Sequence, residues 1–356
     1  MKTESTHARP RNSKSRAKAA RAGARNGAAR SSAKNGAARA AAKNGVSAKN
    51  GAAAKNGNAS SRAGAKKKPA PAPKSPRARV QAVAKKRVKR APKAAPFTAK
   101  TADKHVLYQM SVQDAAVEVD FIAGAFSKFR KRKALSLRED FCGTALICSH
   151  WVKSDPKRTA TGIDIDSKVL AWGKANNIAP LAVDQGRVQL LQQDVRGKIH
   201  SKVDAVCAFN FSYWIFTTRD SMREYFKKVR AGLVKDGIFC LDSYGGWEAM
   251  EPMLEQRNIK RKFTYVWDQD LLDPITHKVV NYIHFEFNDG TKLNKAFRYE
   301  WRYWSLPELQ ELLLEAGFKS VHVYWDQSDD DDDEDYRPTL RAENQPGWLA
   351  YLVALN

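Results

Sequence analysis

Short strand-like runs alternate with helical segments along most of the chain, and this order restricts the fold more than any other feature of the sequence. Runs rich in apolar and β-branched residues predict strands at residues 134–140, 158–165, 187–194, 203–211 and 238–244. Helical patterns fill most of the intervals around them, at residues 112–129, 143–152, 166–177 and 219–233. The alternation predicts an α/β fold with a doubly wound, mostly parallel sheet.

Each of these predicted strands ends in a polar or acidic side chain. The set comprises Glu139 and Asp140, Asp164, Asp194, Asn210, and Asp242 with Tyr244. Any one of these acids alone is explained as well by a solvated cap or an ion pair. Ligands of doubly wound sheets bind beyond the carboxyl ends of the strands, so the ordered set predicts one shared binding cleft.

The chain changes character after residue 244. Residues 262–273, 278–289 and 294–305 are predicted to form three successive antiparallel strands, with a turn signal at Asn288-Asp289-Gly290. We assign residues 245–304 to an antiparallel β insert. A helix at residues 305–318 and strands at residues 319–326 and 347–355 complete the pattern.

The insert is unusually aromatic. Aromatic residues occupy the odd-numbered positions from Phe297 to Tyr303, and charged residues occupy the even-numbered positions from Arg298 to Arg302. Because alternate residues of a strand share a face, one face is aromatic and the other is charged. Packing against the main sheet would explain this pattern. The alternative, which we favour, is that the insert forms a lid over a substrate.

The first hundred residues differ sharply from the rest. They carry 28 Lys and Arg and one acid, Glu4, which gives a net charge of +27, whereas residues 101–356 carry 34 Lys and Arg and 37 acids, which gives −3. Phe97 is the only aromatic residue among them. A segment that can bury so little apolar surface cannot offset the entropy of ordering, so residues 1–100 are predicted to be a disordered basic tail before a domain at 101–356.

The tail repeats a short unit. Lys-Asn-Gly recurs at residues 34–36, 43–45, 49–51 and 55–57 after Arg-Asn-Gly at 25–27. A polycation of this kind binds phosphate backbones by counterion release without reading bases, so non-specific nucleic-acid binding is the favoured interpretation. A solubility or anchoring tail and an organellar transit peptide remain open as alternatives.

Cysteines and apolar runs indicate a soluble intracellular protein. The four cysteines form no Cys-x-x-Cys pair, so neither a metal site nor a disulfide framework is predicted, and buried free thiols are expected. No apolar run approaches the length of about 20 residues that a membrane span needs. We expect a cytoplasmic location, with association with a nucleoid or nucleus through the tail. The acidic run at 328–336 is predicted to be a solvated loop, with docking of the tail as the alternative.

Over residues 105–356 the chain resembles the class I (Rossmann-like) S-adenosylmethionine-dependent methyltransferases. The resemblance rests on six segments, "EDFCGT" (139–144), "TGIDID" (161–166), "LLQQDV" (190–195), "VDAVCAFNF" (203–211), the Lys-Asp-Gly turn (235–237) and "WSLPELQELLLEAGF" (304–318). The common first motif of the family is Asp-x-Gly-x-Gly-x-Gly, from which this chain keeps only Gly143, with Phe141 and Ala145 at the outer glycine positions. The resemblance implies a seven-stranded sheet whose last strand is antiparallel, and S-adenosylmethionine as cofactor.

The resemblance also implies roles for individual residues. Glu139, with Asp140, would accept from the ammonium group of the cofactor, and backbone N–H groups of Phe141, Cys142, Gly143 and Thr144 would hold its carboxylate. Asp164 would bind the ribose hydroxyls, and Asp194 with the Val195 N–H would bind the adenine edge. Ile165 or Phe211 would pack on the adenine face, and Tyr108 would be an aromatic residue of a lid.

The acceptor is less clearly indicated than the cofactor. Asn210 and Tyr244 are candidates to contact the reacting groups, while His284 is expected to lie at a rim. We favour a small-molecule acceptor, because the fourth strand lacks the Asn/Asp-Pro-Pro-aromatic sequence of base amino-methylases and the domain is net negative. Protein or nucleic-acid methylation, and a nucleic-acid- or chromatin-associated protein with a catalytically silent domain, remain alternatives. The oligomeric state is not indicated.

Overall fold

The computed structural model describes residues 97–198, 200–328 and 335–356. The predictions for the basic tail, including its repeats, its disorder and its binding to nucleic acid, fall almost wholly on residues outside these ranges. The same holds for most of the acidic run.

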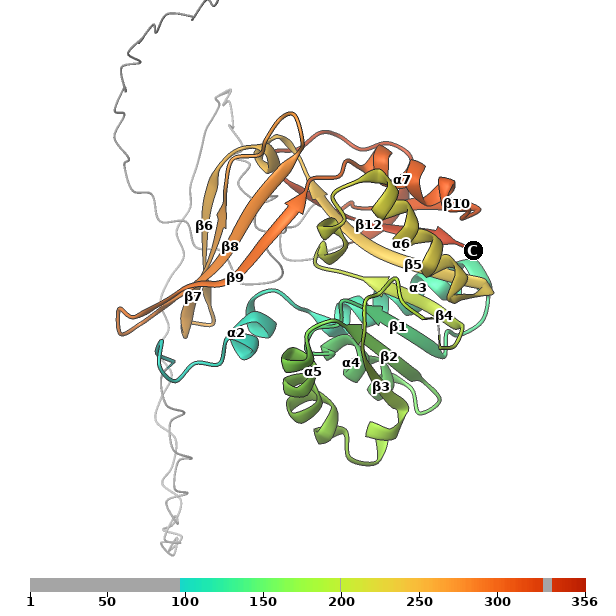
Figure 1. Cartoon of the computed structure of the whole chain (residues 1–356), viewed down its shortest axis with the longest axis horizontal. Helices are drawn as coiled ribbons and strands as arrows, with labels where there is room; N and C mark the ends of the chain where they lie inside the picture. The colour runs from blue at the N-terminus through green and yellow to red at the C-terminus, as the bar shows by residue number, and fades with distance from the viewer. Residues whose placement is uncertain (1–96, 199, 329–334) are drawn as a thin grey trace, which may run out of the picture. The chain divides into compact units, whose positions relative to one another are not determined.

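The main sheet has eight strands in the order β11-β10-β12-β5-β4-β1-β2-β3 (Figure 1). The strands are β1 Ser136–Asp140, β2 Thr159–Asp164, β3 Val188–Gln192, β4 Val203–Ala208, β5 Leu233–Gly245, β10 Ser320–Asp326, β11 Tyr336–Thr339 and β12 Trp348–Leu355. Strands β1 to β5 pair in parallel, and β12 lies antiparallel between β5 and β10. The predicted doubly wound α/β sheet is therefore confirmed with all seven strands. The eighth, β11, is a short edge strand that pairs with β10 and that the sequence did not indicate.

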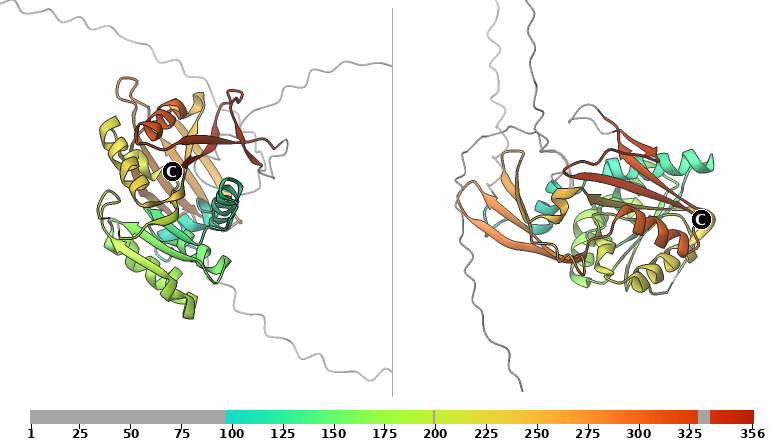
Figure 2. Two further views of the ribbon diagram at one scale, coloured as in Figure 1. Left: turned by 90° about the vertical axis from the view of Figure 1, so that its right-hand side faces the viewer. Right: turned by 90° about the horizontal axis from the view of Figure 1, so that it is seen from above.

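Helices cover both faces of this sheet (Figure 2). They are α3 Ala115–Arg130, α4 Leu146–Ser154 and α5 Ser167–Gly173 on one side, and α6 Arg219–Ala231 and α7 Leu306–Glu315 on the other. In α6 the buried residues Met222, Tyr225, Phe226 and Val229 recur at the spacing of one helical face, and Thr218 with Ser221 forms a capping box. This burial attaches α6 to β5.

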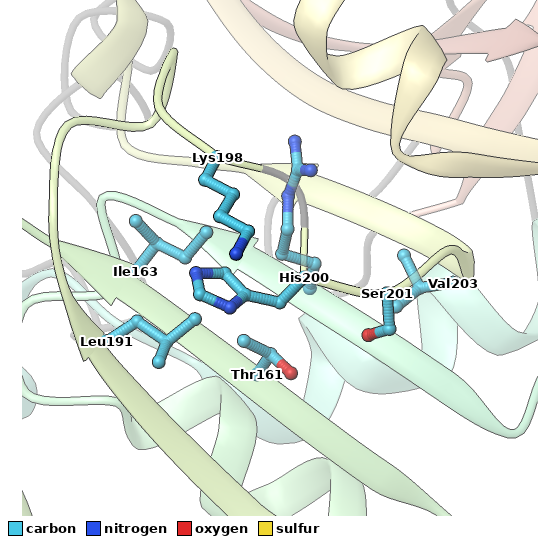
Figure 3. A pocket seen from close by; sticks show the side chains of 8 residues that line it. Thr161, Ile163, Leu191, Lys198, His200, Ser201 and Val203 are labelled. Atoms are coloured by element: carbon cyan, nitrogen blue, oxygen red, sulfur yellow. The ribbon is translucent and has the colours of Figure 1, made fainter.

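Residues 193–202 join β3 to β4 without a helix in their described part, so a loop alone covers part of the sheet there. Figure 3 shows the side chains of Lys198 and His200 above Ile163 and Leu191 in a small hollow at this place. Its volume of about 10 Å³ is on the order of one water molecule, so this hollow is no site for a cofactor.

The insert forms a second, four-stranded antiparallel sheet in the order β6-β7-β8-β9. Its strands are β6 Met253–Ile259, β7 Phe263–Gln269, β8 Lys278–Phe287 and β9 Lys292–Arg302. The three predicted strands are present, and β6 is an additional one. Burial alternates along β8, which shows that one face of the insert is packed and the other is partly open to solvent.

Further short elements complete the described part of the chain. They are α2 Lys104–Ser111, the π-helix η1 Lys174–Ile178 and the 3₁₀ segments η2 Ala179–Arg187, η3 Ser212–Ile215 and η4 Trp247–Met250. The helix α2 was not predicted, because its eight residues are too few for a clear helical period. No helix among the described residues is both long enough and apolar enough to cross a bilayer. All four cysteines are buried and free, as expected.

Candidate cofactor and acceptor site

The turn after β1 adopts the backbone of a glycine-rich loop with a single glycine. Phe141, Gly143 and Ala145 have φ angles of 57°, 51° and 56°, so all three positions where the common motif carries glycine are left-handed. Such a backbone strains residues other than glycine by about 1–3 kcal/mol each. The loop is nevertheless fixed, since Cys142 N–H donates to Ile163 O over 2.9 Å and Ala145 N–H donates to Cys142 O over 2.7 Å.

The helix that follows this loop begins without a side-chain cap. Ala145 occupies the N-cap position of α4 and offers no hydroxyl or carboxylate to the first N–H groups of the helix. A helix N-terminus attracts an anion, because its N–H groups and its dipole are both positive there, and here the Glu139 carboxylate already accepts from Cys148 N–H in the first turn of α4. The loop is held from the opposite side by Asn177, whose amide donates to Thr144 O over 2.8 Å.

Glu139 is a buried carboxylate directly beneath the loop. Its side chain accepts a hydrogen bond from Cys148 N–H in α4 over 3.0 Å. Burial is the main cause that raises the pKa of Glu139 to about 7, and the nearby carboxylates of Asp164 and Asp140 add to it. A cationic ligand beside Glu139 would favour its ionised form.

Asp140 lies beside Glu139 in β1 but has a different role. Its carboxylate accepts from Arg138 Nε over 2.8 Å and from Arg138 Nη2 over 2.9 Å, and from the Tyr225 hydroxyl over 3.0 Å. The buried ion pair lies within β1, and the hydrogen bond from Tyr225 ties β1 to α6. The contacts favour Glu139 alone for an ammonium group, because the Asp140 carboxylate is committed to Arg138 and Tyr225.

Asp164 ends β2 at the edge of the same loop. Its carboxylate accepts from Gly143 N–H over 2.8 Å and from Asp166 N–H over 2.9 Å, so the ends of β1 and β2 are locked together. The next residue, Ile165, is 71% exposed, which is unusual for a large apolar side chain beside a rigid polar loop. Such a side chain suits contact with the flat apolar face of a ligand.

Asp194 and Val195 follow β3. The Asp194 carboxylate is paired with Arg196, with 2.8 Å between Asp194 Oδ2 and Arg196 Nη2, and this pairing is the main cause of its lowered pKa. Val195 is buried. Arg196, two residues after Asp194 and not singled out in the sequence analysis, limits the lone pairs that Asp194 can offer to a ligand.

Asn210 and Phe211 lie in the turn after β4 and have φ angles of 57° and 56°. Their N–H groups donate to the buried Asp242 carboxylate over 2.8 and 3.0 Å, which holds this second left-handed turn in place. The Phe211 ring is buried and contacts the rings of Tyr244 and Trp301 at centroid distances of 4.8 and 6.1 Å. Of the two residues predicted for the adenine face, Ile165 is therefore better placed, and Phe211 belongs to the packing between the two sheets.

The unpredicted helix α2 lies between the insert and α5 (Figure 1). Its residue Tyr108 contacts the Phe297 ring of β9 at 5.0 Å, and its Gln109 amide donates to Thr144 Oγ1 of the loop over 2.8 Å. Asp103, which caps α2, accepts from Trp172 Nε1 of α5 over 2.6 Å. A helix of about two turns thus connects the loop, α5 and the insert, and the lid role expected of Tyr108 stays a prediction.

The buried face of the insert contains polar residues that sequence reasoning did not single out. Gln269 and Asn281 are 2% and 0% exposed and oppose each other in neighbouring strands β7 and β8. Asn281 falls between Val279 and Ile283 on an otherwise apolar face, and this break in the alternation was the available signal. By contrast, His284 lies on the other face and contacts Asp268 over 3.1 Å, as the rim prediction requires.

Comparison with known proteins gives matches at the level of structure alone. No family model matches the chain, and no curated protein matches it. Among solved structures, an S-adenosylmethionine-dependent methyltransferase from Clostridium acetobutylicum is 17% identical with a TM-score of 0.53, and the match covers 71% of this chain and 97% of that one. The sugar N-methyltransferase KedS8 from Streptoalloteichus is 14% identical with a TM-score of 0.51, over 75% and 96%. DesVI from Streptomyces venezuelae is 14% identical with a TM-score of 0.51, over 70% and 95%. The chain therefore has the class I, Rossmann-like fold of S-adenosylmethionine-dependent methyltransferases.

Proposed function

We propose that this protein is an S-adenosylmethionine-dependent methyltransferase that acts on a small molecule. The observation that carries the proposal is the junction of Glu139, Gly143 and Asp164, where a buried carboxylate, the start of α4 and a strand-end acid meet around one glycine-type loop. A ligand that joins an amino acid to a nucleoside requires such groups, to bind its ammonium group, its carboxylate and its ribose hydroxyls. A bare strand-to-helix corner has no need of two left-handed residues that are not glycine.

The residues present fit the cofactor. Glu139 would hold the ammonium group. Because the N–H groups of Cys142 and Gly143 donate to Ile163 O and to Asp164, those of Phe141 and Thr144 with the start of α4 would hold the carboxylate. Asp164 would hold the ribose hydroxyls. Asp194 and the Val195 N–H would meet the adenine edge, with the exposed Ile165 against the adenine face.

When bound, the cofactor supplies an electrophilic methyl group on a sulfonium. The protein's share of the reaction is to align the acceptor and to exclude water. The helix α2, with Tyr108, is suited to cover the cofactor, and the aromatic face of the insert is suited to cover the acceptor. Tyr244 lies at the end of β5 and Asn210 lies just after β4, so they remain the candidates to contact the reacting groups.

A small acceptor is favoured over a macromolecule by the insert. It places the rings of Trp267, Tyr299 and Trp301 close to one another, with Tyr299 and Trp301 stacked at 4.6 Å, in front of the strand ends. Such a wall suits a compact ligand better than a duplex or a folded protein. The fold shared with KedS8, which is described as a sugar N-methyltransferase, is in keeping with this choice.

Non-specific nucleic-acid binding by residues 1–100 is proposed on composition alone. A catalytically silent, nucleic-acid-associated protein is the competing function, and cofactor binding separates the two. Titration calorimetry with S-adenosylmethionine should show one site per chain in the methyltransferase. A wild-type protein that gives no heat and no competition with S-adenosylhomocysteine would support the silent alternative.

Replacing Asp164 tests the site directly. Asp164→Ala should weaken cofactor binding by about 1–3 kcal/mol, because charge-assisted hydrogen bonds to the ribose are lost. Asp164→Asn keeps the shape of the side chain and should weaken binding less. Asp120→Ala, at an exposed position of α3, is the control and should leave affinity unchanged. Equal affinity for all of these variants would contradict the assigned cofactor site.

A further inference from the structure

Several buried polar groups near the insert make no hydrogen bond to any described residue. They are both amide atoms of Asn281, the Gln269 side-chain oxygen, the Tyr244 hydroxyl and Glu255 Oε2. Buried polar groups in folded proteins are almost always paired, and leaving one unpaired costs on the order of 1–3 kcal/mol. A group of them in one region points to a ligand that supplies the missing partners.

These four side chains belong to one region. Gln269 and Asn281 are directly opposite in register, and Asn281 is opposite Tyr299 in β9. Glu255 in β6 is opposite Trp267, two residues before Gln269 along β7. The Tyr244 hydroxyl, at the end of β5, faces the Asn281 amide without a hydrogen bond of standard geometry. The set therefore extends from a strand end of the main sheet onto the insert.

The chemistry of the set favours a ligand rich in hydrogen-bond donors. Within this set, oxygens on Glu255, Gln269, Asn281 and Tyr244 can accept, and the Asn281 amide and the Tyr244 hydroxyl can donate, with the Tyr265 hydroxyl and Trp214 Nε1 as further donors nearby. Glu255 adds negative charge, which the guanidinium of Arg257 partly offsets, and burial raises its pKa to about 7. A cation beside Glu255 would stabilise its ionised form.

The surrounding rings favour the same kind of ligand. Trp267 lies beside the stacked rings of Tyr299 and Trp301, at centroid distances of 6.4 and 6.2 Å, and Trp301 contacts Trp214 at 6.1 Å. Aromatic faces attract cations and stack on flat or ring-shaped molecules. Oxygens that accept, a carboxylate and aromatic faces together recognise an amine carried by a ring.

We propose that the methyl acceptor is a ring-bearing primary or secondary amine, bound by Asn281, Gln269, Tyr244 and Glu255. The inference rests on the proposed function and adds the substrate class to it. The amine, once it has lost its proton to solvent, forms a nitrogen–carbon bond to the methyl group as the carbon–sulfur bond breaks. The electron pair of that bond passes to sulfur, and the positive charge passes to the new ammonium group.

The class of the acceptor is tested with the full-length protein. Methyl-labelled S-adenosylmethionine is incubated with the protein and a small-molecule extract of cells. The labelled product is first separated by chromatography from unreacted S-adenosylmethionine, which is itself a cation, and is then passed through a strong cation exchanger at pH 4. Label in an amine should be retained, and base titration of the eluted product should show an amine. Label that flows through, or that is carried by an ether, ester or carbon-bound methyl group, would overturn the proposal while leaving the methyltransferase function intact.

Variants test the residues. Asn281→Leu should lower the rate of label transfer at limiting extract by at least tenfold and leave cofactor affinity unchanged. It should also raise the melting temperature, because it removes two unpaired polar atoms from an apolar face. If Asn281 only supported the fold, its replacement would lower the melting temperature and leave the rate of label transfer unchanged. Asn294→Leu, at an exposed position of β9, is the matched control and should change neither transfer nor melting temperature.

Glu255→Gln tests whether the negative charge of Glu255 contributes to binding of the amine. Glu300→Gln, on the open face of β9, is its control. The Glu255 variant should lose transfer by about tenfold, while the control should keep it. If Asn281→Leu melts lower and transfers label normally, the assigned acceptor site is wrong. If no cofactor binds to the wild-type protein, the proposed function itself fails and the inference fails with it.

Discussion

At the scale of single residues, the site is defined by side chains and backbones that would be unfavourable elsewhere. Phe141, Ala145, Asn210 and Phe211 all have left-handed backbones, and they lie in the two turns that follow β1 and β4. Strain of this kind persists where the surroundings fix it, and it gathers at functional sites. Here the carboxylate of Asp242 and the backbone of the neighbouring strands fix it.

The raised pKa of Glu139 leads to a pH-dependent affinity for the cofactor. With a pKa of about 7 in the free protein, most Glu139 side chains are protonated at pH 6. The ammonium group of the ligand favours the carboxylate, so binding releases a proton and affinity rises with pH. One-proton linkage predicts an increase of about fivefold between pH 6 and pH 7.

Titration calorimetry in buffers of different ionisation enthalpy measures both the affinity and the released proton. Glu139→Gln keeps an oxygen that can accept from Cys148 N–H but cannot ionise, so its affinity should be lower and flat over this range. An unchanged pH profile in that variant would show that another group releases the proton.

At the scale of elements, α2 connects parts of the site that are far apart in the sequence. Its cap, Asp103, is bonded to Trp172 of α5, its Gln109 is bonded to the loop at Thr144, and its Tyr108 contacts Phe297 of the insert. The helix has eight residues, too few to be stable alone, so these contacts hold it in place. A lid with few anchors can open to admit a cofactor.

Removing one anchor should loosen this lid. Trp172→Phe keeps a ring beside His105 but loses the hydrogen bond to Asp103. We expect faster hydrogen exchange in residues 104–111 and a loss of about 1 kcal/mol in cofactor affinity, which is roughly fivefold. Exchange measured by mass spectrometry, with the half-exposed Trp247→Phe as control, checks this. Equal protection of α2 in both variants would mean that Asp103 and Trp172 do not hold the lid.

At the scale of the whole molecule, charge divides the chain into two parts. Residues 1–100 carry a net charge of +27, and residues 101–356 carry −3. The cofactor and acceptor residues all lie in the second part. Binding of a polyanion by the tail and methyl transfer by the domain should therefore be separable.

Deleting residues 1–96 should test this separation. The full-length protein should bind duplexes of scrambled sequence with affinities that fall steeply as salt rises, because bound counterions are released from the phosphates. The shortened protein should lose this binding and keep its affinity for S-adenosylmethionine. Fluorescence anisotropy at several salt concentrations gives the slope, and duplex binding that survives the deletion would place the polyanion site on the domain.

The sequence alone determined the order of strands and helices along the chain, the doubly wound sheet and the acids at the strand ends. Periodicity and end residues are local properties, and the strands from β1 to β5 repeat them clearly. It also identified the aromatic face of β9, because alternation along one strand fixes which side chains share a face.

Only the tertiary structure decided which partners those acids take. Asp140 and Asp194 pair with Arg138 and Arg196, each two residues away, whereas Glu139 and Asp164 accept from backbone N–H groups. It likewise brought Asn281, Gln269 and Glu255 of the insert to the end of β5, and it folded α2 between the insert and α5. Partners that are distant in sequence leave no local pattern, since long-range contacts depend on how whole elements pack and not on the residues beside them.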